Sequence, residues 1–524
     1  MRRLPIGLSI LASLAIPACL ATGGSSSSFQ VASSSGAGSN STGTPPGGSI
    51  GAIDRLDSEL QALIAAQGLT GDPSTGRTLP SINDPLAQLG RDLFFTKGLG
   101  GDQDVACATC HHPVLGGGDA LSVGVGVDAV DEDLLGPGRV HEHGAPNWDG
   151  GPTIPRNAPT TFNIALWDKY IFWNGRVESL GKTPGLNGDD GQGITTPDMP
   201  WPQVDVNAFS NLVHAQARFP ITAMDEMKGF FFEFGNFPQA TREHLAARLG
   251  DYGIGQGELP YSDWVGRFRT AYNQPGALPK DIVTEQNIAF AISEYQRSQT
   301  FVSTPWRDYV QGDLQAISTD AKLGALLFLK DQASGGADCA SCHSGDFFSD
   351  EEHYVLAMPQ VGRGQSVSIG ATQDVGRFLV DGKPEHLYAF RTPSLLNVAV
   401  TGPWSHAGAY TSLEGVVRHH LNPADALQNY DFGQLAPDVQ TQDTVANSTL
   451  AIQQLYWVRN NGFKTVEDIT LTDLQVQQLL AFLNTLTDPC VTDRQCLDAW
   501  IPDPASPDPD GRRLVGYDQH GSPF

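Results

Sequence analysis

Two stretches of the chain each hold two cysteines and a histidine in the order C-x-x-C-H. In this motif the two thiols add to the vinyl groups of one haem, and the histidine supplies an iron ligand. The alternatives are a zinc site and a thioredoxin-like redox pair, but zinc needs four ligands and no second cysteine pair lies near either motif. The spacing therefore predicts two covalently attached haem c groups. They are held by Cys107, Cys110 and His111 and by Cys339, Cys342 and His343.

A helix is predicted just before each motif. Leucines at positions 86, 89 and 93 share one helical face ahead of the first motif, and those at 323, 326 and 327 do so ahead of the second. Ser318, Thr319 and Asp320 are suitable N-caps for the second helix. Because a helix, a loop and a haem motif occur twice in this order, we expect an internal duplication of a cytochrome-c-like domain.

The remaining pattern is also mainly helical. A helix is expected from about 473 to 486, where Thr472 can cap the first turn and Gln475 can complete a capping box. Strand-like alternation is scarce, and the 58 glycines and 35 prolines indicate long loops. We therefore predict a mainly α fold of two cytochrome-c-like haem domains with long loops around the haems.

The first residues have the composition of an export signal. Two arginines precede an apolar stretch that is too short to span a bilayer, so residues 1–18 are a predicted signal peptide. A small residue before Cys19 resembles a bacterial lipoprotein cleavage site, which would make Cys19 a lipid anchor at the outer membrane. Ordinary secretory cleavage near Ala18 or Ala21 is the alternative. Residues 19–52 are a predicted Gly/Ser tether, and in either case we expect a periplasm-facing protein.

The rest of the chain divides around the two motifs. We predict an N-terminal haem domain at 53–300, a C-terminal haem domain at 301–489 and a tail at 490–524. Cys490 and Cys496 in the tail are expected to form a disulfide, as is common in exported proteins. The formal net charge of −26 argues against nucleic acid and anionic membrane surfaces as partners.

Several further motifs fall between and after the haem motifs. In order, they read Arg-Asn-Ala-Pro-Thr (156–160), Phe-Trp-Asn-Gly-Arg (172–176), Phe-Arg-Thr-Pro-Ser-Leu-Leu-Asn-Val (390–398) and Thr-Gly-Pro-Trp-Ser-His-Ala-Gly (401–408). This order resembles the bacterial di-haem cytochrome c peroxidases and their MauG-type relatives from about residue 86 to 486. Asn174 stands where the family usually has Asp.

The resemblance implies two cytochrome-c domains that face each other, with a Ca²⁺ ion between the haems. Asn157, Thr401 and the carbonyl of Pro403 match the calcium site, and oxygen ligands suit a hard cation. Otherwise Asn157 is a turn residue and the other two form a loop corner. Trp173 matches the aromatic residue between the haems, which implies an electron relay, although core packing would also explain it.

The resemblance also implies a peroxide site at the first haem. Peroxide cleavage needs an open iron position, a group that moves the proton and a polar group that holds the distal oxygen. Gln216 and Glu226 have the family's ten-residue separation and match these roles, with Glu226 as general acid/base. A solvated carboxylate is the alternative for Glu226. An extra segment at about 181–211 is a predicted surface loop.

Two positions depart from the peroxidase pattern. Val125 stands where most peroxidases of this family place a sixth-ligand histidine, so the first haem is expected to stay five-coordinate, with His141 or His143 as substitute ligands in the alternative. His420 matches the distal ligand of the second haem, which is Met in peroxidases and Tyr in MauG, and His419 is the neighbouring candidate. A pair of histidine ligands lowers the reduction potential compared with His/Met.

These observations predict an exported di-haem oxidoreductase that reduces hydrogen peroxide. Its electrons would come from a small periplasmic electron-donor protein or, as in MauG, from a side chain of a partner protein. A di-haem cytochrome for electron transfer alone and a haem oxygenase acting on an organic substrate are the competing interpretations.

Overall fold

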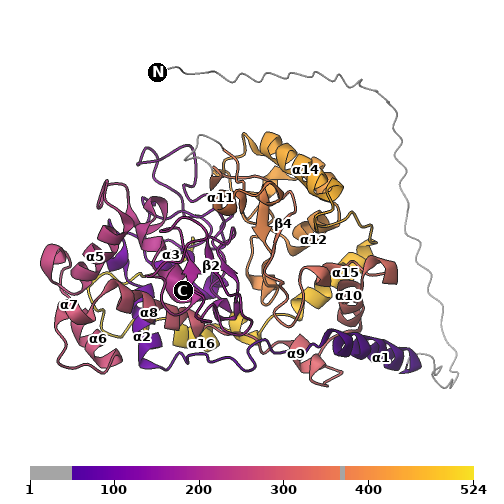
Figure 1. The fold of residues 1–524 in the computed structure, drawn as a ribbon, viewed down its shortest axis with the longest axis horizontal. Helices are drawn as coiled ribbons and strands as arrows, with labels where there is room; N and C mark the ends of the chain where they lie inside the picture. The colour runs from indigo at the N-terminus through magenta and orange to yellow at the C-terminus, as the bar shows by residue number, and fades with distance from the viewer. Residues whose placement is uncertain (1–49, 366–371) are drawn as a thin grey trace, which may run out of the picture. The chain divides into compact units, whose positions relative to one another are not determined.

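The computed structural model describes residues 50–365 and 372–524, and most of its regular structure is helical (Figure 1). The predictions of a signal peptide at 1–18 and of lipidation at Cys19 lie outside the described residues, as does nearly all of the tether predicted at 19–52. Within the described part, no helix is both long and apolar enough to cross a membrane. The helices are α1 (Ile50–Gln67), α2 (Pro85–Phe94), α3 (Cys107–Cys110), α4 (Leu212–Ala217), α5 (Pro238–Leu249), α6 (Trp264–Ala271), α7 (Pro279–Ile282), α8 (Glu285–Arg297), α9 (Pro305–Val310), α10 (Thr319–Leu329), α11 (Phe378–Asp381), α12 (Leu413–Leu421), α13 (Pro423–Gln428), α14 (Thr444–Asn460), α15 (Asp473–Asn484) and α16 (Arg494–Leu497).

The helix before each haem motif crosses a second helix at a glycine. A Cβ atom added to Gly90 of α2 would lie 1.9 Å from the carbonyl oxygen of Ala291 in α8. A Cβ atom added to Gly324 of α10 would lie 1.9 Å from the carbonyl oxygen of Gln478 in α15. Only glycine permits such close contact between two helix backbones. The same helix–glycine–helix relationship therefore precedes both motifs.

The predicted helix caps are confirmed. Ser318 accepts a hydrogen bond from the amide of Ala321 at the start of α10. Thr472 caps α15 and forms the reciprocal capping box with Gln475. These local contacts satisfy amide groups that a helix leaves unpaired in its first turn.

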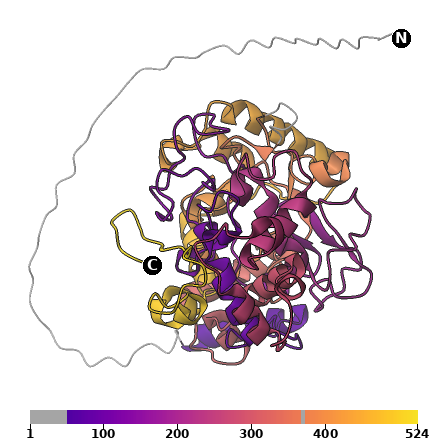
Figure 2. The ribbon, with the colours of Figure 1, turned by 90° about the vertical axis from the view of Figure 1, so that its left-hand side faces the viewer.

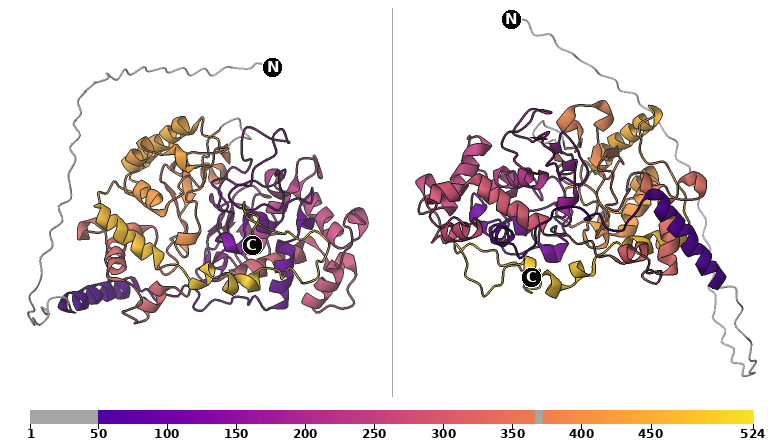
Figure 3. Two further views of the ribbon diagram at one scale, coloured as in Figure 1. Left: turned by 180° about the vertical axis from the view of Figure 1, so that it is seen from behind. Right: turned by 60° about the horizontal axis from the view of Figure 1, so that its bottom comes forward.

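The apolar core has two main parts, one for each helix pair. The first contains buried side chains of α2, α5, α6 and α8. The second contains buried side chains of α1, α9, α10 and α15, among them Leu60 and Ile64 of α1. Figures 1 and 3 show α1 on the side of α9 and α10, away from α2 and α8. The start of the predicted N-terminal domain at 53–300 thus packs with the second core, and the predicted domain limits stay a prediction.

The C-terminal segment returns to the first core. The predicted disulfide between Cys490 and Cys496 is confirmed. Beyond it, the amide of Leu514 donates to the carbonyl of Phe95, and the amide of Lys97 donates to the carbonyl of Arg512, with distances of 2.8 Å each. Figure 2 shows this segment, in yellow, beside the part of the chain that contains α2. The end of the chain therefore contributes to the surroundings of the first haem motif.

Strands are short and few in the described residues. β1 (Tyr170–Ile171), β2 (Val177–Ser179) and β3 (Ile194–Thr195) form an antiparallel sheet in that order, and β4 (His353–Val355) pairs with β5 (Ala389–Arg391). β3 and buried residues such as Asp205 come from the segment at 181–211. This segment is therefore only partly a surface loop, because its middle completes the sheet.

Candidate functional site

Each C-x-x-C-H motif opens onto a cavity. The first cavity has a volume of about 130 Å³ and the second of about 270 Å³. The four motif cysteines are free thiols, so they are available for thioether bonds to haem. The first cavity is lined by Cys107, Cys110 and His111, and the second by Cys339, Cys342 and His343.

The motif histidines present one ring nitrogen to each cavity. The Nδ1 atom of His111 lies 3.2 Å from the carbonyl oxygen of Gly117, and that of His343 lies 3.1 Å from the carbonyl oxygen of Phe348. Burial lowers the pKa of both imidazoles, that of His343 to about 4. A neutral imidazole whose Nδ1–H is bound to a carbonyl has its Nε2 lone pair free for a metal. Both histidines therefore fit an iron ligand.

His420 lies opposite His343 in the second cavity. The Nδ1 atom of His420 lies 2.8 Å from the carbonyl oxygen of Val416, which leaves its Nε2 atom free. The two ring centres are 6.4 Å apart. A metal–imidazole bond is about 2.0 Å long and the ring centre lies about 1.1 Å beyond the nitrogen, so two imidazoles across one iron are separated by roughly 6.2 Å. The geometry thus fits a bis-histidine haem.

His419 has both ring nitrogens engaged elsewhere. Its Nε2–H donates to the carbonyl oxygen of Leu356 at 2.8 Å, and its Nδ1 atom accepts from the hydroxyl of Tyr410 at 2.7 Å. The side chain is fully buried, and burial lowers its pKa to about 3. His419 therefore links buried groups beside the second cavity through hydrogen bonds, and it has no free nitrogen for iron.

Gln216 and Glu226 line the first cavity together with His111. Gln216 comes from α4, which Asn211 caps, and Glu226 comes from the single π-helical turn Met224–Lys228. The Oε1 atom of Gln216 is buried and has no hydrogen-bond partner among the described residues. Irregular helical turns often mark functional sites, because they turn a side chain into a pocket.

The charge state of Glu226 depends on its surroundings. Burial raises the pKa of Glu226, the Arg176 guanidinium acts in the opposite direction, and the Asp225 carboxylate raises it further. Arg176 also lines the first cavity, and its guanidinium lies 3.6 Å from the ring centre of Phe172. A carboxyl group with a raised pKa in a cavity is typical of a general acid/base.

The first cavity also has cationic groups that suit the two carboxylates of a haem. The Nη1 atom of Arg156 and the Nε atom of Arg391 are buried and have no partner in the described part of the chain. Both side chains line this cavity, and so does Arg176. Thiols, a free imidazole nitrogen and unpaired guanidinium atoms together are the donor set that a covalent haem needs. The residues present therefore fit the group that the sequence predicts.

The structure places Val125, His141 and His143 outside the lining of the first cavity. Val125 is buried and its carbonyl accepts a hydrogen bond from Arg139. The ring of His141 is stacked on Trp148 at 5.8 Å, and the ring of His143 contacts Trp148 at 5.3 Å. Neither histidine is positioned as a ligand for an iron beside His111.

One wall is shared by the two cavities. The Nε1–H of Trp173 donates to the carbonyl oxygen of Asn157 at 2.9 Å, and the guanidinium of Arg391 lies 3.2 Å from a ring centre of Trp167. Aromatic rings in this wall stand between the two haem motifs. The residues that line both cavities are Asn157, Pro159, Thr160, Trp167, Trp173 and Arg391.

The residues of the predicted calcium site lie close to this wall. Asn157, Thr401 and Pro403 all line the second cavity. The Nδ2 atom of Asn157 donates to the carbonyl oxygen of Leu121 at 2.8 Å. In residues 50–365 and 372–524 no group of three His, Cys, Asp or Glu side chains could hold a metal, whereas the predicted ligands are amide, hydroxyl and carbonyl oxygens. The calcium site therefore stays a prediction.

Known proteins with the same features are recognisable by sequence. Residues 84–315 match the family described as di-haem cytochrome c peroxidase. Methylamine utilization protein MauG of Methylorubrum extorquens is 27% identical over 66% of this chain and 70% of its own length. Cytochrome c551 peroxidase of Pseudomonas aeruginosa is 26% identical over 68% of this chain and 76% of its own length. The chain is thus similar to the di-haem cytochrome c peroxidases and to MauG.

The fold agrees with this similarity. A crystal structure of a MauG-like protein associated with microbial copper homeostasis aligns with 82% of this chain and 98% of that chain, with a TM-score of 0.51 and 19% identity. The similarity implies two c-type haems and supports a peroxidase-like haem oxidoreductase. The pairing of His343 with His420 is a feature that the geometry of this chain adds.

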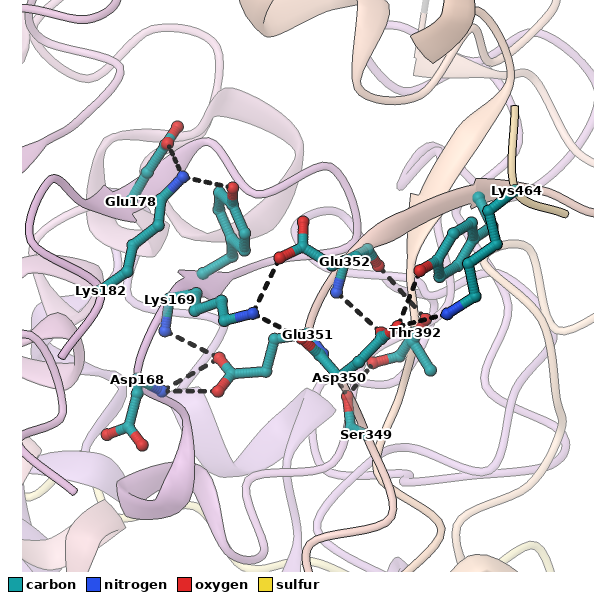
Figure 4. Close-up of polar contacts among 12 residues, drawn as sticks. Asp168, Lys169, Glu178, Lys182, Ser349, Asp350, Glu351, Glu352, Thr392 and Lys464 are labelled. Carbon is teal, nitrogen blue, oxygen red and sulfur yellow. Dashed lines mark hydrogen bonds and ion pairs between the residues drawn. The ribbon is translucent and has the colours of Figure 1, made fainter. Parts of the chain in front are cut away.

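A polar network in this chain was not predicted from the sequence. The carboxylate of Glu351 accepts hydrogen bonds from the amides of Asp168 and Lys169 at 2.8–3.1 Å, and the Lys169 ammonium contacts Glu352 (Figure 4). Burial raises the pKa of Glu351 to about 7, while the amide of Lys169 acts in the opposite direction. The acidic run at 350–352 was the only signal, and such runs usually face solvent.

Asp119 is another unpredicted group in the first cavity. It is 2% exposed, and its Oδ1 atom accepts from the amide of Leu121 at 3.0 Å. Burial raises the pKa of Asp119 to about 7. Its position after three glycines, 116–118, predicts a turn, and nothing in that pattern indicates that the carboxyl group faces a cavity.

Proposed function

We propose that the chain is an exported di-haem peroxidase that reduces hydrogen peroxide to two water molecules with two protons and two electrons. Cys107, Cys110 and His111 would hold the peroxidatic haem. When bound, that haem supplies the iron at which the O–O bond is cleaved. The observation that carries this proposal is the presence of Glu226 and Gln216 in the same cavity as His111.

Glu226 would move the proton in this reaction. Its carboxylate can take a proton from the peroxide oxygen that lies nearer the haem and transfer this proton to the other oxygen, which then departs as water. Gln216 would hold the distal oxygen, since its Oε1 atom is unpaired in the described structure and its amide nitrogen can donate. Burial raises the pKa of Glu226 above its usual range, and the Arg176 guanidinium opposes this increase.

The second haem would be attached by Cys339 and Cys342, with His343 and His420 as its two iron ligands. The 6.4 Å separation of the rings supports this assignment, and the engaged nitrogens of His419 count against the neighbouring alternative. A saturated iron binds no peroxide, so this haem would supply or store an oxidising equivalent. Trp173, in the shared wall, would relay electrons between the haems.

The two haem regions would descend from one duplicated cytochrome-c-like unit, with limits near 53–300 and 301–489 and a separate tail at 490–524. The paired glycines Gly90 and Gly324, each at the crossing of two helices before a haem motif, support the duplication. A Ca²⁺ ion would lie between the haems at Asn157, Thr401 and Pro403. Metal analysis of the purified protein, with and without chelator, tests the calcium assignment.

The electrons would come from a small periplasmic donor protein or from a side chain of a partner protein. A cytochrome for electron transfer alone would need a sixth ligand at the first haem, and the placement of His141 and His143 counts against it. The sequence supports export and a lipid anchor at Cys19. Fatty-acid labelling of the wild type and of Cys19→Ala tests that anchor, and equal labelling of both would exclude it.

The central experiment compares the wild-type holoprotein with Glu226→Gln. We expect one high-spin and one low-spin ferric haem in the EPR spectrum of both proteins. Glu226→Gln should slow the reaction with hydrogen peroxide by about 10²–10⁴-fold, the usual contribution of a general acid/base. Two low-spin haems in the wild type, or a wild-type rate in the variant, would refute the proposed site.

A further inference from the structure

Arg139 donates hydrogen bonds to five main-chain carbonyl groups, although it belongs to none of the motifs above. Its Nε atom lies 2.8 Å from the carbonyl oxygen of Val125, and its Nη2 atom lies 2.9 Å from that of Gly126. The Nη1 atom reaches three more carbonyl oxygens, at 3.0–3.1 Å. These belong to Asp131, Glu132 and Leu134. One buried guanidinium therefore joins two separate stretches of main chain.

The stretch at 125–127 lies directly against the backbone of Glu226. A Cβ atom added to Gly126 would lie 2.2 Å from the carbonyl oxygen of Asp225 and 2.6 Å from that of Glu226. The amide of Val127 donates to the carbonyl of Asp225 at 3.3 Å. A shift of this stretch would therefore displace the backbone that carries the Glu226 carboxyl group.

The other stretch, at 131–135, is held by the end of the chain. The amide of Leu135 donates to the carbonyl of Tyr517 at 2.9 Å, and the amide of Tyr517 donates to the carbonyl of Asp133 at 3.1 Å. The hydroxyl of Tyr517 donates to the Asp131 carboxylate at 2.6 Å. Arg139 thus links the stretch at 131–135, which is hydrogen-bonded to the C-terminal segment, to the stretch at 125–127, which contacts the backbone of Glu226.

We propose that Arg139 is a positioning residue for the peroxide reaction, which sets the place of the Glu226 carboxyl group through the main chain of residues 125–127. This inference rests on the proposed function, because it assumes that Glu226 moves the proton. A general base must lie within hydrogen-bond reach of that proton, and a displacement of about 1 Å can slow a reaction roughly 100-fold. Arg139 itself does not line the first cavity.

Lysine is the informative replacement for Arg139. It keeps the positive charge near Asp104, Asp119 and Asp131, all of which act on the Arg139 guanidinium. A lysine has a single nitrogen, whereas the planar guanidinium presents donors in several fixed directions. Arg139→Lys therefore preserves the local charge and loses the connection between the two stretches.

The test uses the full-length holoprotein with both haems. We expect Arg139→Lys to slow the reaction with hydrogen peroxide by about 10–100-fold and to change its pH profile, with an unaltered spectrum of the second haem. Amide hydrogen exchange in residues 121–127 should become faster. Arg269→Lys is the matched control, because the Arg269 guanidinium also binds a main-chain carbonyl, that of Ala277, away from this loop. The control should behave as wild type in every measurement.

The outcomes separate this inference from the proposed function. If Arg139→Lys reacts at the wild-type rate while Glu226→Gln is slow, Arg139 does not position Glu226 and the inference is wrong. If the wild type does not react with peroxide, the proposed function fails. If amide hydrogen exchange at 121–127 is also unchanged in Arg139→Lys, Arg139 does not hold this stretch of main chain and the inference fails as well. If Arg139→Lys does not fold, Gly126→Ala moves the same loop, and a wild-type rate in that variant contradicts the inference.

Discussion

The ring centres of His343 and His420 lie 6.4 Å apart across the second cavity, the separation of two imidazoles that share one iron. Val416 and Phe348 orient the two rings through their carbonyl groups, so that both Nε2 atoms are free. His420 thus has the geometry of an iron ligand. This relationship has consequences for the redox properties of the protein.

Replacing His420 by methionine should raise the reduction potential of the second haem. A thioether ligand favours the ferrous state more than an imidazole does. We expect a rise on the order of 0.1–0.3 V, within the range of about 0.8 V that axial ligands span. Potentiometric titration of the holoprotein measures it, with EPR to follow the low-spin signal. His419→Gln is the control, which should lower stability but leave the bis-histidine signal intact. An unchanged potential in His420→Met would exclude His420 as a ligand.

The choice between His419 and His420 as iron ligand shows what the sequence alone could not predict. Both lie at the end of α12, and only the surroundings of each ring distinguish them, because Tyr410 and Leu356 engage one and Val416 orients the other. Leu356 comes from a loop that is 63 residues away in sequence, whereas Val416 belongs to α12 and Tyr410 lies just before it. By contrast, haem attachment and helix caps depend on residues a few positions apart, and the caps were predicted correctly.

Residues that act through the main chain were also not predictable. Arg139 binds carbonyl oxygens, which every residue has, so no residue type at any spacing indicates its partners. Gln216 and Glu226 were found because the resemblance supplied their separation. That they share a cavity with His111 follows from tertiary packing alone.

Val125→His should not provide a sixth ligand to the iron of the first haem. Val125 is buried, it does not line the cavity and its carbonyl is held by Arg139, so a histidine side chain there would not face the iron. We expect the high-spin ferric EPR signal to persist, although the larger ring in this buried stretch should displace the neighbouring backbone of Glu226 and slow the reaction with peroxide. Conversion of the first haem to a low-spin state would show that this loop can move toward the iron.

The reaction with peroxide should weaken as the pH falls. Burial raises the pKa of Glu226, so its carboxylate form, which accepts the proton, accumulates only above the usual range of a glutamate. Asp225 adds to this increase in pKa, and therefore Asp225→Asn should move the acidic limb of kcat/KM to lower pH. Steady-state rates at saturating donor between pH 4 and 9 measure the limb. Glu226→Gln should remove the acidic limb of the pH profile. If this limb does not shift in Asp225→Asn, it reports the titration of a group other than Glu226.

The helix crossings should be sensitive to a single methyl group. Gly90→Ala and Gly324→Ala each place a Cβ atom 1.9 Å from a carbonyl oxygen of the partner helix, which forces the helices apart. We expect each to lower the free energy of unfolding by about 1–3 kcal/mol. Gly266→Ala is the matched control, because a Cβ atom added to Gly266 in α6 would meet no atom within 4 Å, and the variant should gain about 0.5–1 kcal/mol from helix propensity. Calorimetry of the three holoproteins measures the differences. If all three variants behaved alike, close helix contact would not determine stability at the two haem regions.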